Sequence, residues 1–144
     1  MKKNIFKNHI IQSASFLACI LAIVMYVSVG CEDYPVDEDG LLITERAQCY
    51  VSNFELLGID YQTVRTKAAA VDTLECKIDV EVFYGTDLKN LYPQFTLVTD
   101  AKLEPKITGL TDFSDLDHPR QYTVISGNRK VRKTYTIYVT VQKP

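Results

Sequence analysis

The sequence has 144 residues, of which 47% are hydrophobic, and a formal net charge of −2 at pH 7. This length is enough for one domain with a single core and too short for two ordinary domains. Removing the three lysines of residues 1–30 from the 16 basic residues leaves 13 against 18 acidic ones, a net charge of −5 that disfavours nucleic acid as a partner.

Residues 1–30 have the pattern of a secretory signal, with a basic start and an apolar run from Phe16 to Val29. This run is shorter than the roughly 20 apolar residues of a spanning helix. The segment resembles a bacterial lipoprotein signal with Gly30-Cys31 as the cleavage junction, although Ser28 stands where such signals usually have Leu. We therefore expect a lipid on Cys31 that anchors the chain to a membrane without spanning it. The alternatives are an ordinary signal peptide or an uncleaved anchor with an incidental cysteine.

Residues 31–45 are acidic, contain Pro35 and Gly40, and have little to bury, which predicts an extended, solvated tether. The acidic start also resembles the export signal that follows the lipidated cysteine of Bacteroidetes lipoproteins and directs them to the outer face of the outer membrane. The resemblance implies a surface location, and the alternative is a plain charged linker.

Residues 46–144 are expected to form the folded domain. Apolar and charged residues alternate over 74–82, which predicts a half-buried antiparallel strand. Residues 122–126 and 135–141 predict a hairpin. Its connection holds a basic cluster that we interpret as a solvated loop: Arg129, Lys130, Arg132 and Lys133.

Weaker patterns lie between these strands. Residues 49–56, 95–98 and 102–107 predict strands, and Pro105 in the last of them indicates an edge strand or a strand break. Residues 64–71 favour neither helix nor strand, 85–91 predict a helical turn capped by Thr86 or Asp87, and 109–118 predict a loop. Short strands without a long helix predict an all-β fold, an antiparallel β-sandwich of about seven strands for which an immunoglobulin-like topology stays open.

Two cysteines fall within the expected domain, Cys49 and Cys76. An exported protein meets an oxidising compartment, so a disulfide between them is one candidate and two free thiols are the other. Their spacing is unlike that of a zinc site, and no cofactor or metal is expected.

The C-terminal half resembles a known module. Residues 84–93 (YGTDLKNLYP), 101–105 (AKLEP), 112–114 (DFS) and the strand pair from Tyr122 to Val141 are similar to motifs of Bacteroidetes surface lipoproteins. The resemblance implies an immunoglobulin-like β-sandwich of unassigned function, usually found at the N-terminus of larger lipoproteins and often encoded with polysaccharide-uptake systems.

Catalytic chemistry is disfavoured by the residues present. His118 is the one histidine after residue 30, and its neighbours Ser114 and Asp115 share its loop, whereas a catalytic triad recruits distant segments. Asp112, Asp115 and Asp117 lack the glycine and distal glutamate of a calcium loop. We therefore expect no catalytic residue and no metal site.

Carbohydrate binding is the stronger alternative, because sugar rings stack on aromatic side chains. The sequence has no Trp but offers several tyrosines, of which Tyr138 and Tyr92 are the candidates for stacking: Tyr50, Tyr61, Tyr84, Tyr92, Tyr122 and Tyr138. We expect a non-catalytic, lipid-anchored protein of the outer-membrane surface that serves as a spacer or interaction module, with a glycan or another surface protein as partner. A small carbohydrate-binding lipoprotein is the alternative, and a hydrolase is the least favoured.

Overall fold

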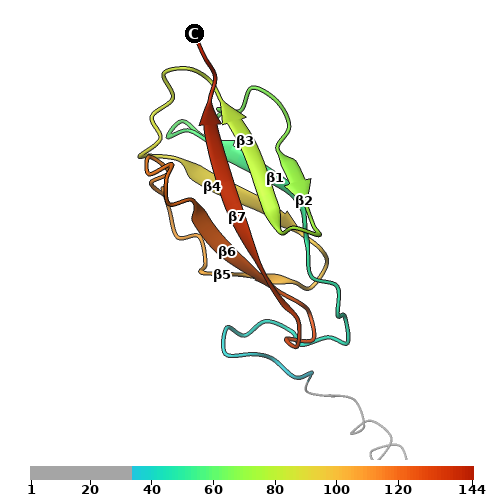
Figure 1. The fold of residues 1–144 in the computed structure, drawn as a ribbon. Coiled ribbons are helices and arrows are strands. Elements are labelled where there is room, and N and C mark those ends of the chain that lie inside the picture. Colours follow the sequence, from blue (N-terminus) through green and yellow to red (C-terminus); the bar gives the residue numbers. More distant parts are fainter. Residues whose placement is uncertain (1–33) are drawn as a thin grey trace, which may run out of the picture. The chain divides into compact units, whose positions relative to one another are not determined.

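The computed structural model describes residues 34–144, so the expected signal peptide and Cys31 lie outside the described residues. Within 34–144 all the regular structure is β-strand, and no helix there is long and apolar enough to cross a membrane. The strands follow one another along the chain (Figure 1): β1 (Val51–Leu57), β2 (Ala70–Asp72), β3 (Lys77–Val82), β4 (Tyr92–Leu97), β5 (Lys102–Glu104), β6 (Arg120–Ile125) and β7 (Arg132–Val141).

The strands form two sheets. β1 and β4 make a two-stranded sheet, and the other sheet has the order β2-β3-β7-β6-β5. Buried and exposed residues alternate along β3 and through most of β7, as expected when one face of a sheet meets the core and the other meets solvent. The predicted all-β, immunoglobulin-like sandwich of about seven strands is confirmed.

One ladder in the larger sheet is parallel. β3 pairs antiparallel with β2 but parallel with β7, in a register from Lys77 opposite Thr136 to Val82 opposite Val141. The prediction of an antiparallel strand over 74–82 is therefore wrong for the longer of its two ladders. A period of two reports which face is buried, and it carries no information on the direction of the partner strand.

The structure decides three local predictions. Residues 85–91 form successive turns instead of a helical turn, with Asn90 N donating to Asp87 O at 3.4 Å and Lys89 N to Asp87 Oδ1 at 3.0 Å. The prediction of an edge strand around Pro105 is confirmed, since β5 is the outermost strand of its sheet and ends at Glu104. The segment 64–71, for which the sequence favoured neither helix nor strand, ends in the short strand β2, and this strand continues to Asp72.

The core lies between the sheets and is built on aromatic side chains. Phe54 of β1 packs edge-on against Phe95 of β4 at 4.9 Å between ring centroids, and Phe95 contacts Tyr122 of β6 at 5.0 Å. Tyr135 of β7 is fully buried, and its hydroxyl accepts a hydrogen bond from Val51 N at 3.4 Å. These contacts join the two sheets and satisfy the one polar atom that Tyr135 brings into the core.

Truncating the centre of this core should be costly. Phe54 is fully buried, so Phe54→Ala is expected to lower the free energy of unfolding by about 3–5 kcal/mol, measured by urea denaturation. Leu74→Ala is the matched control, because Leu74 is 90% exposed in the β2–β3 turn and its truncation should cost less than about 0.5 kcal/mol. Equal losses for the two variants would contradict this assignment of the core.

Candidate functional site

His118 lies in an exposed loop and forms a local pair. Its Nδ1 is 3.0 Å from Asp115 Oδ2, and the histidine side chain is 84% exposed. The hydrogen bond from His118 lowers the pKa of Asp115. Ser114 takes part in a different contact, with its backbone N donating to Asp112 Oδ1 at 2.8 Å. The loop therefore offers two turn-capping carboxylates, and Ser114 is not aligned with the His118–Asp115 pair.

The carboxylates of this loop do not gather around a common point. Asp112 and Asp115 each accept hydrogen bonds from backbone N–H groups two or three residues ahead. Within residues 34–144 no three Asp, Glu, His or Cys side chains are placed to hold a metal ion. The acidic loop is thus explained by turn formation.

The two tyrosines singled out for stacking lie on different sheets. Tyr92 begins β4 opposite Leu57 of β1, on the outer face of the small sheet. Tyr138 lies on the outer face of the large sheet, where it pairs in register with Asp79. Lys77 Nζ is 5.0 Å from the Tyr138 ring centroid, so a cation covers one face of the ring. The two residues do not form a joint site.

Tyr92 has an aromatic neighbour that the sequence did not single out. The Tyr61 ring lies 5.8 Å from the Tyr92 ring at an interplanar angle of 57°, and Tyr61 is 67% exposed. A tight turn holds it, with Tyr61 N donating to Gly58 O at 3.0 Å and Gln62 N to Asp60 Oδ1 at 3.1 Å. Gly58 followed by Asp60 directly after a strand is the turn signal that could have located it.

Cys49 and Cys76 are both free thiols in this structure. Cys49 is buried, and its Sγ donates to Val124 O at 3.1 Å, while burial raises the pKa of the thiol. Cys76 lies in the turn directly before β3, where its backbone adopts φ 52°. A disulfide between Cys49 and Cys76 stays one of the two alternatives that the sequence leaves open.

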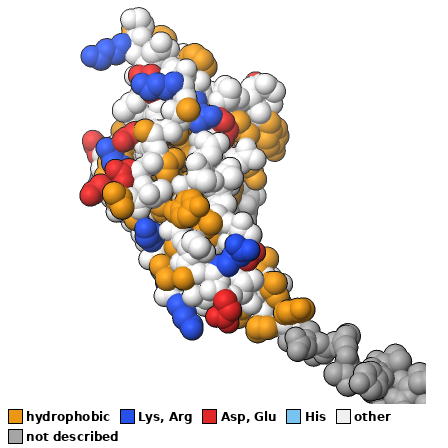
Figure 2. All heavy atoms as spheres, turned by 90° about the vertical axis from the view of Figure 1, so that its right-hand side faces the viewer, with side chains coloured by type: hydrophobic (Ala, Val, Ile, Leu, Met, Phe, Trp, Pro, Cys, Tyr) orange, Lys and Arg blue, Asp and Glu red, His pale blue; other side chains and the backbone are white. Residues whose placement is uncertain are grey.

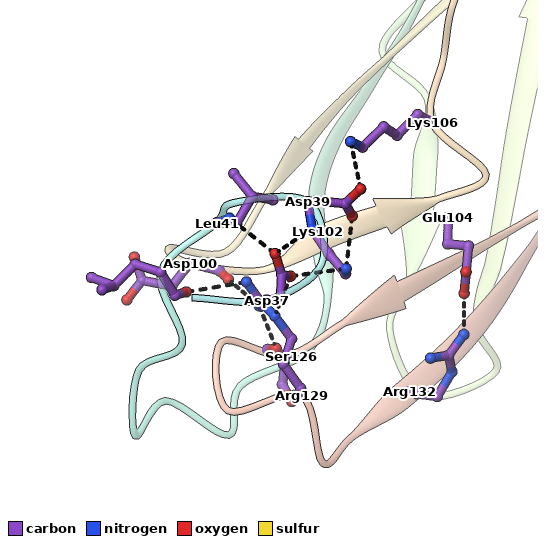
Figure 3. Close-up of polar contacts among 11 residues, drawn as sticks. Asp37, Asp39, Leu41, Asp100, Lys102, Glu104, Lys106, Ser126, Arg129 and Arg132 are labelled. Atoms are coloured by element: carbon purple, nitrogen blue, oxygen red, sulfur yellow. Dashed lines mark hydrogen bonds and ion pairs between the residues drawn. The ribbon is translucent and has the colours of Figure 1, made fainter. Parts of the chain in front are cut away.

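The strongest electrostatic feature is the attachment of the segment before β1. We call residues 35–46 the strap. Asp37 of the strap has a side chain only 8% exposed, and its Oδ2 lies 2.9 Å from both Lys102 Nζ and Arg129 Nε. Its Oδ1 accepts hydrogen bonds from Leu41 N at 2.9 Å and Asp39 N at 3.0 Å (Figure 3). We call Asp37, Asp39, Lys102 and Arg129 the clasp.

Arg129 is the member of the clasp that ties the β6–β7 turn to the strap. Its Nη2 donates to Leu42 O at 3.1 Å, and its Nη1 donates to Ser126 O at 2.9 Å and Asp100 O at 3.1 Å. Its side chain is 15% exposed, so the interpretation of this residue as part of a solvated basic loop is wrong. The planar guanidinium suits this role because its donors point in fixed directions toward several acceptors.

The charges of the clasp stabilise one another. Lys102 Nζ lies 2.8 Å from Asp39 Oδ2, and Lys106 Nζ lies 2.8 Å from Asp39 Oδ1. The hydrogen bond from Lys102 holds the pKa of Asp37 well below its usual range and lowers that of Asp39, while both carboxylates raise the pKa of Lys102. Removal of one member would leave a partly buried charge without its partner.

The strap also meets the turns through its backbone. Thr44 N donates to Gly127 O at 3.0 Å, and Asn128 N donates to Arg46 O at 2.9 Å. A Cβ on Gly127 would lie 2.4 Å from Thr44 Oγ1, so the approach requires glycine. We expected this segment to be a solvated tether, but from residue 35 onward it is attached to the domain. The reason is that Asp37 forms ion pairs with Lys102 of β5 and Arg129 of the β6–β7 turn.

The fold and these contacts define a small β-sandwich module with a fixed N-terminal attachment. The chain belongs to the family described as SGBP, N-terminal, whose profile matches residues 59–140. The match agrees with the resemblance to N-terminal modules of Bacteroidetes surface lipoproteins. Among curated proteins, none matches the chain by sequence.

Three solved Bacteroides structures are similar to parts of this chain. A protein provisionally described as a glycoside hydrolase, from Bacteroides thetaiotaomicron, superposes with a TM-score of 0.56 and 27% identity over 80% of this chain. The chain spans only 28% of that protein. A protein of Bacteroides fragilis provisionally described as secreted has a TM-score of 0.48 at 13% identity, covering 67% of this chain and 97% of its own. A DUF4623 family protein of Bacteroides eggerthii has 0.49 at 17% identity, covering 67% and 22%.

The clasp predicts an acid-sensitive contribution to stability. The pKa of Asp37 is lower in the folded chain than its unfolded value near 4, so the ionised carboxylate stabilises the fold above that pH and ceases to as the pH falls below it. The difference in unfolding free energy between the wild type and Asp37→Asn should therefore be fully developed at pH 6 and narrow below about pH 4. Urea titrations across this range measure it.

Asp79→Asn is the control for the acid series. Asp79 pairs with Lys77 at 2.9 Å, but both side chains are about half exposed, so this pair should contribute little at any pH. An Asp37→Asn difference that stays constant down to pH 2 would contradict the assignment of the clasp.

The close contact between the strap and the β6–β7 turn can be tested by substitution at Gly127. Gly127→Ala should displace the strap and speed tryptic cleavage at Arg46, and Thr44→Ala in the same chain should restore part of the protection by removing the nearest contact. Gly109→Ala is the matched control, since a Cβ there meets nothing within 4 Å. Unchanged cleavage in Gly127→Ala would show that the strap is not packed on this turn.

Proposed function

We propose that this chain is a non-catalytic lipoprotein of the outer-membrane surface that acts as a spacer or interaction module in a glycan-utilisation system. Membership of the SGBP, N-terminal family supports the glycan-related setting. The clasp is the observation that carries the mechanical part of this role, because it fixes the strap to the domain. Cys31 precedes Asp37 by six residues, so an extended chain between them reaches at most about 20 Å.

A spacer must hold its far end away from the anchor, and the strand arrangement suits this. We call the end that carries the strap and the turns 98–101 and 126–131 the proximal end. The loops 58–63, 83–91 and 109–119 lie at the opposite, distal end, as does the end of β7 (Figure 1). The clasp joins the proximal turns, so it leaves the distal loops free to meet a partner.

The mixed charge of the surface is compatible with an interaction role and does not favour a strongly charged partner. On the face in Figure 2, acidic and basic side chains are interspersed among apolar ones. A carbohydrate-binding protein is the second candidate, favoured by the exposed Tyr61 next to Tyr92. A hydrolase is the least favoured. Although one structural relative is provisionally described as a glycoside hydrolase, this chain spans 28% of it.

Lipid anchoring is tested by replacing the cysteine that would carry the lipid. Cys31→Ala is expected to move the protein out of the membrane fraction, because the folded domain would then lack its anchor. The wild type should sediment with membranes and should be digested by proteinase K added to intact cells. Immunoblots of the fractions and of the protease-treated cells measure both properties.

Cys19→Ala is the matched control, since it removes a cysteine of the same leader without touching the expected cleavage junction. It should leave membrane association and protease access unchanged. Membrane association that persists in Cys31→Ala would refute lipidation, and full protection of the wild type in intact cells would refute surface display.

A further inference from the structure

The outer face of the small sheet carries a row of side chains that the core does not use. In the β1–β4 ladder, Phe54 opposite Phe95 points into the core, so the flanking pairs point outward. We call this outward set the polar strip: Tyr92, Gln94 and Thr96 on β4, and Asn53, Glu55 and Leu57 on β1. Asn53, Gln94 and Thr96 are exposed.

An aromatic platform closes one end of the polar strip. The Tyr61 ring lies next to Tyr92 at 5.8 Å, and two thirds of its surface remains exposed. Tyr61 has a backbone φ of 59°, a conformation that glycine would adopt more cheaply. The backbone conformation therefore does not explain why residue 61 is a tyrosine. The ring is the part that distinguishes it from glycine, and the contact with Tyr92 covers only part of this ring.

The charged groups of the polar strip compensate each other. Glu55 accepts a hydrogen bond from Thr63 Oγ1 at 2.7 Å and forms an ion pair with Arg65 Nη2. Arg65 also donates to Phe54 O at 2.6 Å, which fixes the guanidinium beside the strand. The carboxylate keeps a defined position while the net charge of the pair is zero. The strip thus holds one carboxylate in a fixed position, and its charge is compensated by Arg65, so the strip does not favour an ionic ligand.

We propose that the polar strip and Tyr61 form a binding site for a neutral polysaccharide chain. The exposed tyrosine ring suits the apolar C–H face of a sugar ring, and the side-chain amides of Asn53 and Gln94 donate and accept at once, as vicinal sugar hydroxyls require. From residue 92 to residue 96 the strand rises roughly 14 Å, the length of a short oligosaccharide. This inference rests on the proposed role in glycan utilisation and names the ligand class for one surface of the domain.

The chemistry of the strip favours a glycan over a protein partner. A stable protein interface needs roughly 800 Å² on each side with an apolar core, whereas here the apolar surface is confined to the aromatic end. Tyr138 is the weaker alternative for sugar stacking, because it is 40% exposed and Lys77 already covers its ring.

The test is native gel electrophoresis of the full, lipid-bearing chain in detergent, through gels containing starch, xyloglucan, galactomannan or mixed-linkage β-glucan, with polygalacturonate gels as the anionic comparison. At least one of these neutral polysaccharides should retard the wild type. Tyr61→Gly should weaken that retardation at least about tenfold in apparent affinity, because it removes the stacking surface. Gln94→Ala should weaken it less. The melting temperature of Tyr61→Gly should stay close to that of the wild type, since glycine suits φ 59° and the fold does not depend on this ring.

Tyr138→Ala is the matched control and should retain full retardation. Four results would overturn the proposal: no retardation by any of the neutral polysaccharides, retardation only by polygalacturonate, retention of binding in Tyr61→Gly, or equal loss in Tyr138→Ala. Each is distinguishable from a failure of the proposed function, because membrane association and protease access in cells are measured separately and do not require this surface.

Discussion

The alternation of side chains along a strand constrains this domain more than any other single property. Phe54, Phe95 and Tyr122 meet between the sheets, and these contacts determine which face of β1 and β4 is buried. The neighbouring residues Glu55 and Gln94 must then face solvent, since a shift by one residue would exchange the two faces. The polar strip is thus a direct consequence of the aromatic core beneath it.

The strap depends on the same frame but is held by a different force. Lys102 comes from β5 and Arg129 from the β6–β7 turn, so the cations that bind Asp37 are in place only when the large sheet is complete. The Asp37 carboxylate retains four hydrogen-bonding partners there, which offsets the cost of removing it from water. The position of the strap therefore depends on the folded state of the domain.

The fold and the function rest on different kinds of evidence here. Membership of the SGBP, N-terminal family places the domain among related modules, and the β-sandwich itself hosts many unrelated functions. The relative from Bacteroides thetaiotaomicron is a much longer protein, so its activity resides in a polypeptide of which this domain matches about a quarter. A role for this chain has to be argued from its own surfaces, and the clasp and the polar strip are the two that its side chains define.

Local sequence was sufficient for the properties that depend on neighbouring residues. The alternation over 74–82 and 135–141 located β3 and β7, and Pro105 marked the end of an edge strand. Both are local properties, because the burial of one strand face and the missing N–H of proline depend only on consecutive residues.

The tertiary structure decided three contacts that local sequence does not specify. These are the parallel pairing of β3 with β7, the burial of Asp37 between Lys102 and Arg129, and the position of Tyr61 beside Tyr92. Each of these contacts joins segments separated by at least thirty residues. No periodicity within one segment specifies such contacts, since they follow from how the sheets stack and how the turns approach one another.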